Sequence, residues 1–96
     1  MNVRYTRNAL RDLEQISSYL AARNVKVAAD VLAAVEDVAS RLERFPYSAQ
    51  ATEMPGVRAA PVTGFPYIIF YTVENPDVVI HHVRHAARLR PWHEPE

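Results

Sequence analysis

The stretch Gly64–Val83, which reads GFPYIIFYTVENPDVVIHHV, decides the fold class of this sequence. Its segment Tyr67–Val73 is the densest run of aromatic and β-branched residues in the chain, and such residues favour strands. Glu74–Asp77 interrupts the run with residues that favour turns, and Val78–Val83 resumes it. Because both faces of Tyr67–Val73 are largely apolar, we predict an interior strand that pairs with Val78–Val83 through the turn.

The composition indicates one globular domain over residues 1–96. The chain is 49% hydrophobic and 23% charged, as ordinary soluble domains are. It has no cysteine, which excludes disulfides, a thiol nucleophile and a cysteine-ligated metal. The opening MNVRYTR is not a signal segment, and no apolar run is long enough to cross a bilayer. We therefore expect a cytoplasmic protein with no membrane attachment.

Charge is unevenly distributed along a chain whose formal net charge is zero. The zero balance excludes a general attraction of the whole molecule for nucleic acid. Between Asp77 and Glu94, however, there is no acidic residue and there are seven basic or titratable ones: His81, His82, Arg84, His85, Arg88, Arg90 and His93. This segment is either a binding surface or simply an exposed strand end and tail.

Two amphipathic helices are predicted before the central strand. Leucine and isoleucine recur at helical spacing from Leu10 to Leu20, and Thr6 or Asn8 is suited to capping this helix. It should stop near Arg23–Asn24, since asparagine tolerates the left-handed conformation that ends helices. We expect its outer face to carry the polar residues Arg11, Asp12, Glu14 and Gln15.

A second apolar stripe runs from Ala28 to Leu42, and Phe45–Pro46 ends it, because the residue before proline avoids helical angles. The link between the two helices is so short that they must form an antiparallel hairpin. Both stripes then need an apolar surface to cover, and one face of the sheet provides it.

The remaining segments complete a β-α-α-β-β-β order. Asn2–Tyr5 is a short strand candidate, and Val57–Val62 is a weaker strand whose proline marks an edge or a strand end. Tyr47–Gly56 should be irregular, and beyond Val83 the chain should leave the sheet, with an irregular tail over about 89–96. The sequence thus predicts an α+β domain with a helical hairpin on one face of a small, mostly antiparallel sheet.

Most catalytic and metal-binding motifs are missing. Two glycines cannot form a phosphate-cradling loop, and no serine lies in a recognisable nucleophile turn. His81 and His82 are neighbours on a strand and should point to opposite faces, so they are a poor metal pair. His81 and His85 could share a face only if the strand continued that far. We expect neither a metal nor a cofactor.

The layout resembles the RelE/ParE superfamily of toxins from bacterial type II toxin–antitoxin systems. The resemblance starts with YTRNALRDLEQISSYLAARN, runs through RFPYSA and PGVRAAPV, and is strongest at YIIFYTVENPDVVIHHVRHAARLRPW. There the family shows an aromatic strand, a polar turn and a β-branched strand, followed by a histidine, two small residues and an arginine. In this sequence the last four positions are His85, Ala86, Ala87 and Arg88. It implies plasmid stabilisation or a stress response, and a hetero-oligomer with an antitoxin of the ParD-like, ribbon-helix-helix type. The antitoxin tail would lay a helix, with or without an added strand, into an apolar groove.

The branch within the superfamily is indicated by one position. Ribosome-dependent RNA-cutting members usually carry an arginine directly after the tyrosine of the central strand, where this chain has Ile68. The resemblance therefore favours the ParE branch, whose members poison DNA gyrase without evident catalytic residues of their own, although Leu89 replaces an aspartate often found there. The alternative is a RelE-like endoribonuclease acting on mRNA at the ribosome, with Arg58, His85 and Arg88 as catalytic candidates. A third possibility is a decayed toxin that only binds its antitoxin.

For the gyrase-directed interpretation, we expect four residues near the target: Arg84, Arg88, Arg90 and Trp92. An acidic antitoxin segment would neutralise the three arginines, adding association rate more than affinity.

Overall fold

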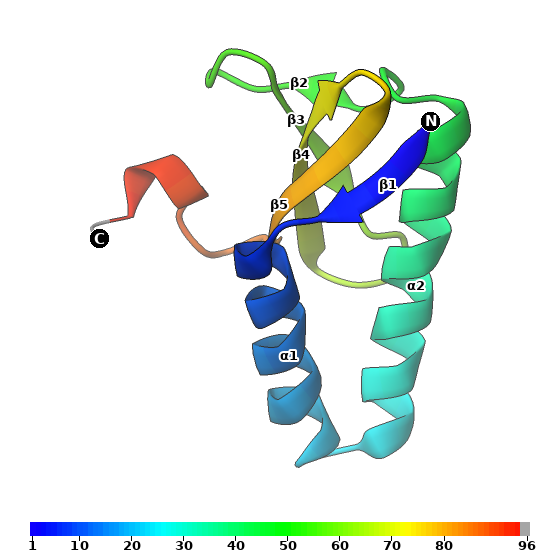
Figure 1. Ribbon diagram of the computed structural model, residues 1–96. Helices are drawn as coiled ribbons and strands as arrows, with labels where there is room; N and C mark the ends of the chain where they lie inside the picture. The colour runs from blue at the N-terminus through cyan, green and yellow to red at the C-terminus, as the bar shows by residue number, and fades with distance from the viewer. Residues whose placement is uncertain (95–96) are drawn as a thin grey trace.

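The computed structural model describes residues 1–94 and arranges them as a helical hairpin on one face of a five-stranded sheet (Figure 1). The elements are β1 (Asn2–Tyr5), α1 (Arg7–Ala21), α2 (Val25–Arg44), β2 (Gln50–Ala51), β3 (Val57–Pro61), β4 (Tyr67–Glu74), β5 (Asp77–His85) and a 3-10 turn, η1 (Pro91–His93). The strand order is β1-β5-β4-β3-β2, with β1 parallel to β5 and every other pair antiparallel. The predicted α+β class and the interior position of β4 are confirmed.

The helix boundaries follow from side-chain caps. The Thr6 hydroxyl accepts a hydrogen bond from the Ala9 N–H at 3.1 Å and begins α1. Asn24 accepts one from the Val27 N–H at 3.2 Å and begins α2, with an extended φ of −160°. The prediction that Asn24 ends the first helix in a left-handed conformation was therefore wrong, because its side chain caps the next helix. Phe45 ends α2 as expected.

The core lies between α2 and the middle of the sheet. Val35, Val38 and Leu42 of α2 are almost completely buried, as are Ile69 and Tyr71 of β4. The helix α1 contributes only one fully buried side chain, that of Ala9, and its other apolar residues are partly exposed. The hydroxyl of Tyr71 donates a 2.8 Å hydrogen bond to the Pro46 carbonyl, which fixes the chain where it leaves α2.

A β-bulge in β5 changes which face its residues occupy. The pairing with β4 shifts between Phe70 and Tyr71, so that His81 has no partner across the ladder. His81 and His82 consequently line the same pocket, beside Phe70 and Thr72, on the face away from the helices. The prediction that the two histidines point to opposite faces was wrong, because it assumed unbroken alternation.

Two strand boundaries also differ from the sequence prediction. β5 continues to His85, since Arg84 and His85 still pair with the first two residues of β4. Gln50–Ala51, expected to be irregular, adds a two-residue strand outside β3. Residues 89–94 form the η1 turn and its flanks, while 95–96 of the predicted irregular tail lie outside the described residues. Within residues 1–94, no helix is long and apolar enough to span a membrane.

Substituting Tyr71 by phenylalanine should lower the free energy of unfolding by about 1–2 kcal/mol, because the Pro46 carbonyl loses its hydrogen-bond donor. Tyr67→Phe is the matched control, since the Tyr67 hydroxyl makes no hydrogen bond within the described residues. Chemical denaturation of the three proteins measures the difference, and equal losses in both variants would contradict the assigned role of the Tyr71 hydroxyl.

Candidate functional site at the basic end of the sheet

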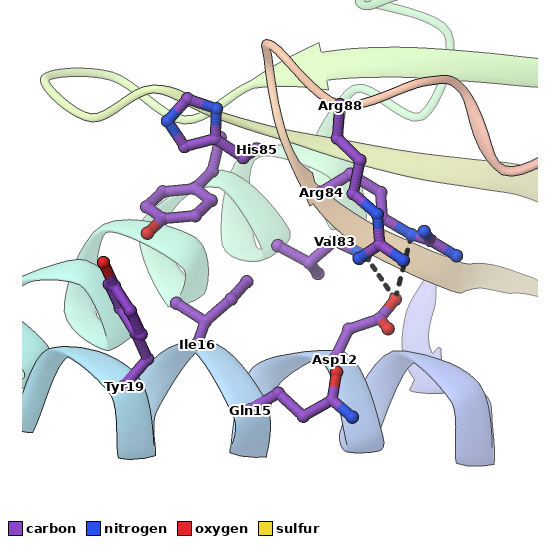
Figure 2. Close-up of a pocket in the computed structure, with 9 residues that line it drawn as sticks. Asp12, Gln15, Ile16, Tyr19, Val83, Arg84, His85 and Arg88 are labelled. Atoms are coloured by element: carbon purple, nitrogen blue, oxygen red, sulfur yellow. Dashed lines mark hydrogen bonds and ion pairs between the residues drawn. The ribbon is translucent and has the colours of Figure 1, made fainter. Parts of the chain in front are cut away.

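The end of β5 and the turn after it bring Arg84, His85 and Arg88 together. We call this region the basic end of the sheet. The His85 ring accepts a hydrogen bond from the Ala87 N–H at 3.0 Å, and the His85 carbonyl accepts one from the Arg88 N–H at 3.0 Å. This tight turn folds Arg88 back beside Arg84. All three side chains line a pocket of about 320 Å³ between α1 and the strand ends (Figure 2).

Asp12 of α1 organises the cationic side of this pocket. Its carboxylate is only 12% exposed and accepts a hydrogen bond from the Val83 N–H at 3.1 Å. The same oxygen lies 3.2 Å from His82 Nδ1 and 3.7 Å from Arg84 Nε. Figure 2 shows Asp12 reaching from the helix toward Arg84.

Asp12 does not lie on the outer face of the first helix, and the prediction that it would was wrong. Asp12 follows the buried Ala9 by three residues and precedes Ile16 by four, so it lies on the side of α1 that faces the sheet. That spacing was the available signal, but a charged residue in such a position is normally read as solvated.

The opposite side of the pocket is aromatic. Tyr67 and His85 make an edge-to-face contact with their ring centroids 5.6 Å apart, and Tyr19 and Ile16 line the pocket from α1. Burial raises the pKa of the Tyr67 hydroxyl above its ordinary value, so this tyrosine is neutral near pH 7. The pocket thus presents an aromatic wall opposite an arginine wall.

The C-terminal segment lies on the face of the sheet that the helices leave open. Trp92 packs edge-to-face on Phe70, with a centroid separation of 5.5 Å, and its indole N–H donates a 3.2 Å hydrogen bond to Glu53. Arg90 donates a 3.1 Å hydrogen bond to the same carboxylate. Glu53 comes from the segment between β2 and β3, where no pattern of residues indicated a partner for the tail.

Glu94 brings a second carboxylate to the basic end. It forms ion pairs with Arg84 and with Arg88, the latter at 2.7 Å. The hydrogen bond from Arg88 is the main reason that the pKa of Glu94 lies below its ordinary value. The three arginines expected to meet a partner are therefore all paired with acids of the chain itself, Arg84 and Arg88 with Glu94 and Arg90 with Glu53.

The three candidate nuclease residues are not brought together. The Arg58 guanidinium donates hydrogen bonds to the carbonyls of Ala49 at 2.7 Å and Tyr47 at 3.3 Å. Arg58 stands opposite Tyr71, whereas His85 stands opposite Tyr67. Four residues of strand separate these two ladder positions, which is about 13 Å. Only His85 and Arg88 share a pocket.

Ile68 is half-buried and pairs across the ladder with Arg84. His81 and His82 are each engaged with a side chain: His81 Nε2 lies 2.8 Å from the Thr72 hydroxyl, and His82 lies beside Asp12. Residues 1–94 contain no group of three or more histidine or acidic side chains arranged to hold a metal ion.

The fold and the basic strand end define a toxin of the RelE/ParE superfamily. A family model described as the ParE toxin of the type II toxin–antitoxin system, parDE, matches residues 3–90, and the chain belongs to this family. It is 32% identical over 89 residues to a Sinorhizobium fredii protein named "Putative toxin Y4kP", covering 93% of this chain and 92% of that protein.

Three solved structures share the fold. A structure of the chromosomal ParDE system from P. aeruginosa has a TM-score of 0.67 at 23% identity, covering 88% of this chain and 95% of that one. The toxin–antitoxin complex RelBE2 from Mycobacterium tuberculosis has a TM-score of 0.61 at 28% identity, with the same coverage of 88% and 95%. The isolated E. coli RelE toxin has a TM-score of 0.63 at 14% identity, covering 96% of this chain and 90% of that one.

Replacing Asp12 by alanine should reduce the free energy of unfolding by about 2–4 kcal/mol, because it leaves the Val83 N–H and one side of Arg84 without a partner. Asp12→Asn keeps an acceptor for Val83 and should lose roughly half as much. Glu14→Ala, an exposed position on the same helix, is the control and should change stability by less than about 0.5 kcal/mol. Urea unfolding distinguishes the three, and a neutral Asp12→Ala would refute the assigned role.

The tail should detach in acid. Glu53 has a lowered pKa, caused chiefly by a hydrogen bond from its own backbone N–H and then by Trp92 and Arg90, and the pKa of Glu94 is lowered as well. Because the pKa of each carboxyl group is lowered in the folded chain, the two ionised carboxylates stabilise the tail on the sheet at pH values above 4.5, the ordinary pKa of glutamate. This stabilisation is lost as the pH falls through the lowered pKa values.

Trp92 is the single tryptophan of the chain, so its fluorescence reports the detachment directly. The emission should shift to the red below pH 4.5 while far-ultraviolet circular dichroism is still native, and Glu53→Gln should flatten the transition. A shift that coincides with global unfolding in both proteins would contradict this expectation.

Proposed function

We propose that this chain inhibits DNA gyrase in the bacterial cytoplasm and is neutralised by a ParD-like, ribbon-helix-helix antitoxin, as part of a plasmid-stabilising or stress-response pair. The observation that carries the choice of target is the separation of Arg58 from His85 and Arg88. RNA cleavage through the 2′-hydroxyl needs a base, an acid and a cation within reach of one phosphate. Arg58 instead directs its guanidinium to the carbonyls of Ala49 and Tyr47, and it does not line the pocket that His85 and Arg88 share.

The environment of position 68 supports the same target. Ile68 lies on the face of Arg84, where a nuclease of this superfamily would need a second cation to clamp the scissile phosphate. Loss of one such transition-state contact costs about 10²–10³ in rate. We infer that the basic end binds a protein surface and performs no chemistry on a phosphate.

The proposed gyrase contact uses the accessible part of the basic end. Arg88 and Arg90 have side chains that are 52% and 41% exposed, whereas Arg84 is 11% exposed. Arg88, Arg90 and Trp92 would therefore touch the target, and Arg84 would anchor the strand end behind them. Arginine and tryptophan are the residues that most often dominate protein interfaces.

A different surface is available to the antitoxin. Leu10 of α1 is 55% exposed and Leu13 is only half-buried, since the sheet covers mainly the Ala9 side of this helix. An amphipathic antitoxin helix could bury both leucines without touching Arg88 or Trp92.

The test is expression of the chain without an antitoxin, with two readouts in the same culture. Gyrase inhibition predicts an SOS response and filamentation, whereas ribonuclease activity predicts codon-phased mRNA ends. Codon-phased cleavage without DNA damage would transfer the assignment to a RelE-like endoribonuclease.

Arg88→Ala and Trp92→Ala should each relieve toxicity, because removing a central arginine or tryptophan from an interface weakens binding by about tenfold or more. Arg23→Ala is a matched control, since Arg23 stacks on Tyr19 at the far end of the hairpin. Co-purification with the antitoxin should be largely retained by all three variants, because the exposed leucine surface of α1 is unchanged in each. Full toxicity of both Arg88→Ala and Trp92→Ala would exclude this contact surface.

A further inference from the structure

A second pocket lies on the face of the sheet that the helices leave open, between the strands and the tail. Among the described residues, it shares no lining side chain with the pocket at the basic end. Its volume is about 320 Å³, and most of its lining is apolar, contributed by Met54, Val57, Phe70 and Trp92. A mostly apolar cleft with few polar groups is the usual form of a small-molecule site, and this volume, near the lower end for such sites, suits one or two rings.

The polar side of this pocket is formed by Thr72 and His81. The Thr72 hydroxyl lies 2.6 Å from a carboxylate oxygen of Glu74 and 2.8 Å from His81 Nε2. The hydrogen bond from Thr72 is the main reason that the pKa of Glu74 lies below its ordinary value, so this carboxylate is ionised near pH 7 and can only accept. The single hydroxyl proton of Thr72 is therefore donated to Glu74, and Nε2–H of His81 donates to the Thr72 oxygen.

These contacts fix the tautomer of His81. With the proton on Nε2, the Nδ1 atom of the neutral ring is an acceptor, and it has no hydrogen-bond partner within residues 1–94. Among those residues, the one buried side-chain nitrogen or oxygen without a partner is Arg84 Nε, so His81 Nδ1 is accessible. A ring that lines the pocket thus holds an unused acceptor for a donor group of a ligand.

The surrounding charges favour a neutral ligand. The guanidinium carbon of Arg90 lies 5.9 Å from the ring centroid of Phe70 and 5.7 Å from that of Trp92, where a ligand cation would otherwise stack. Arg90 is itself paired with Glu53. An anion would be repelled by Glu74 and by the lone pair of the imidazole.

We propose that this pocket binds a small, neutral aromatic molecule of one or two rings that carries an N–H or O–H donor, such as an indole or a phenol. The rings would lie among the apolar side chains, and the donor would bond to His81 Nδ1. Because Trp92 is part of the lining, a bound molecule would also join the tail to the sheet. The inference concerns this pocket alone and holds whichever target the toxin has.

The experiment titrates the full, isotope-labelled chain with indole at pH 8, where an imidazole is ordinarily neutral. Trp92 is the single tryptophan, so its indole N–H gives one resonance that reports on the pocket directly. This resonance should shift saturably. Benzofuran has the same shape as indole but no donor, and it should bind about fivefold more weakly, since that is the affinity that one net hydrogen bond provides.

Two variants test the role of the imidazole. His81→Phe keeps a ring but removes the acceptor, so it should bind indole no better than benzofuran. Thr72→Val keeps the imidazole but releases its tautomer, so it should reduce the preference for indole even if His81→Phe does not fold. Thr63→Val is the matched control at an exposed position in the turn before β4, and it should retain the fivefold preference.

The proposal would be overturned by the absence of a saturable shift, or by equal affinities of the wild-type chain for indole and benzofuran. A full preference for indole in a folded His81→Phe or Thr72→Val chain would also overturn it. Tighter binding of N-acetyl-tryptophanamide than of indole would replace the small molecule by an aromatic side chain of a partner protein. Tighter binding of benzoate than of indole would contradict the neutral character of the ligand.

Discussion

The hydrogen bond from the Val83 N–H to the Asp12 carboxylate is the contact on which the basic end depends. β1 pairs with β5 only as far as Ile80, and beyond that point the outer edge of β5 has no strand beside it. The first turns of α1 take over, since the Thr6 hydroxyl donates to the His81 carbonyl at 3.2 Å and Asp12 accepts from Val83 at 3.1 Å. The start of α1 thus satisfies backbone groups of β5 that a longer β1 would otherwise have satisfied.

The bulge at His81 determines which side of the sheet receives the arginine. Val78 and Ile80 face the helices, and unbroken alternation would have directed Arg84 to the same side, into the core. The extra residue lets Val83 return to the core and turns Arg84 outward, toward the tail. The outward placement of Arg84 therefore depends on the unpaired His81, three positions earlier. Asp12 then stabilises Arg84 in that place.

Local patterns predicted the elements, whereas long-range contacts made the site. The α2 stripe, the short β1 and the aromatic β4 were all readable, because each signal lies within a few neighbouring residues. The bulge left no such signal, and neither did the partnership of Glu53 with Trp92, which joins residues 39 positions apart. Resemblance to the superfamily supplied the topology, yet it could not show that Arg58 is used to hold backbone carbonyls.

The parallel pairing of β1 with β5 also has a temporal consequence. It joins residues 75 positions apart, with both helices and three strands between them. Closing so long a loop must wait until β5 has left the ribosome, so the helical hairpin can form early but the sheet cannot be completed. The arginine end is assembled in that same last step. During most of its own synthesis the nascent chain therefore lacks the basic end that we propose as its target-binding surface.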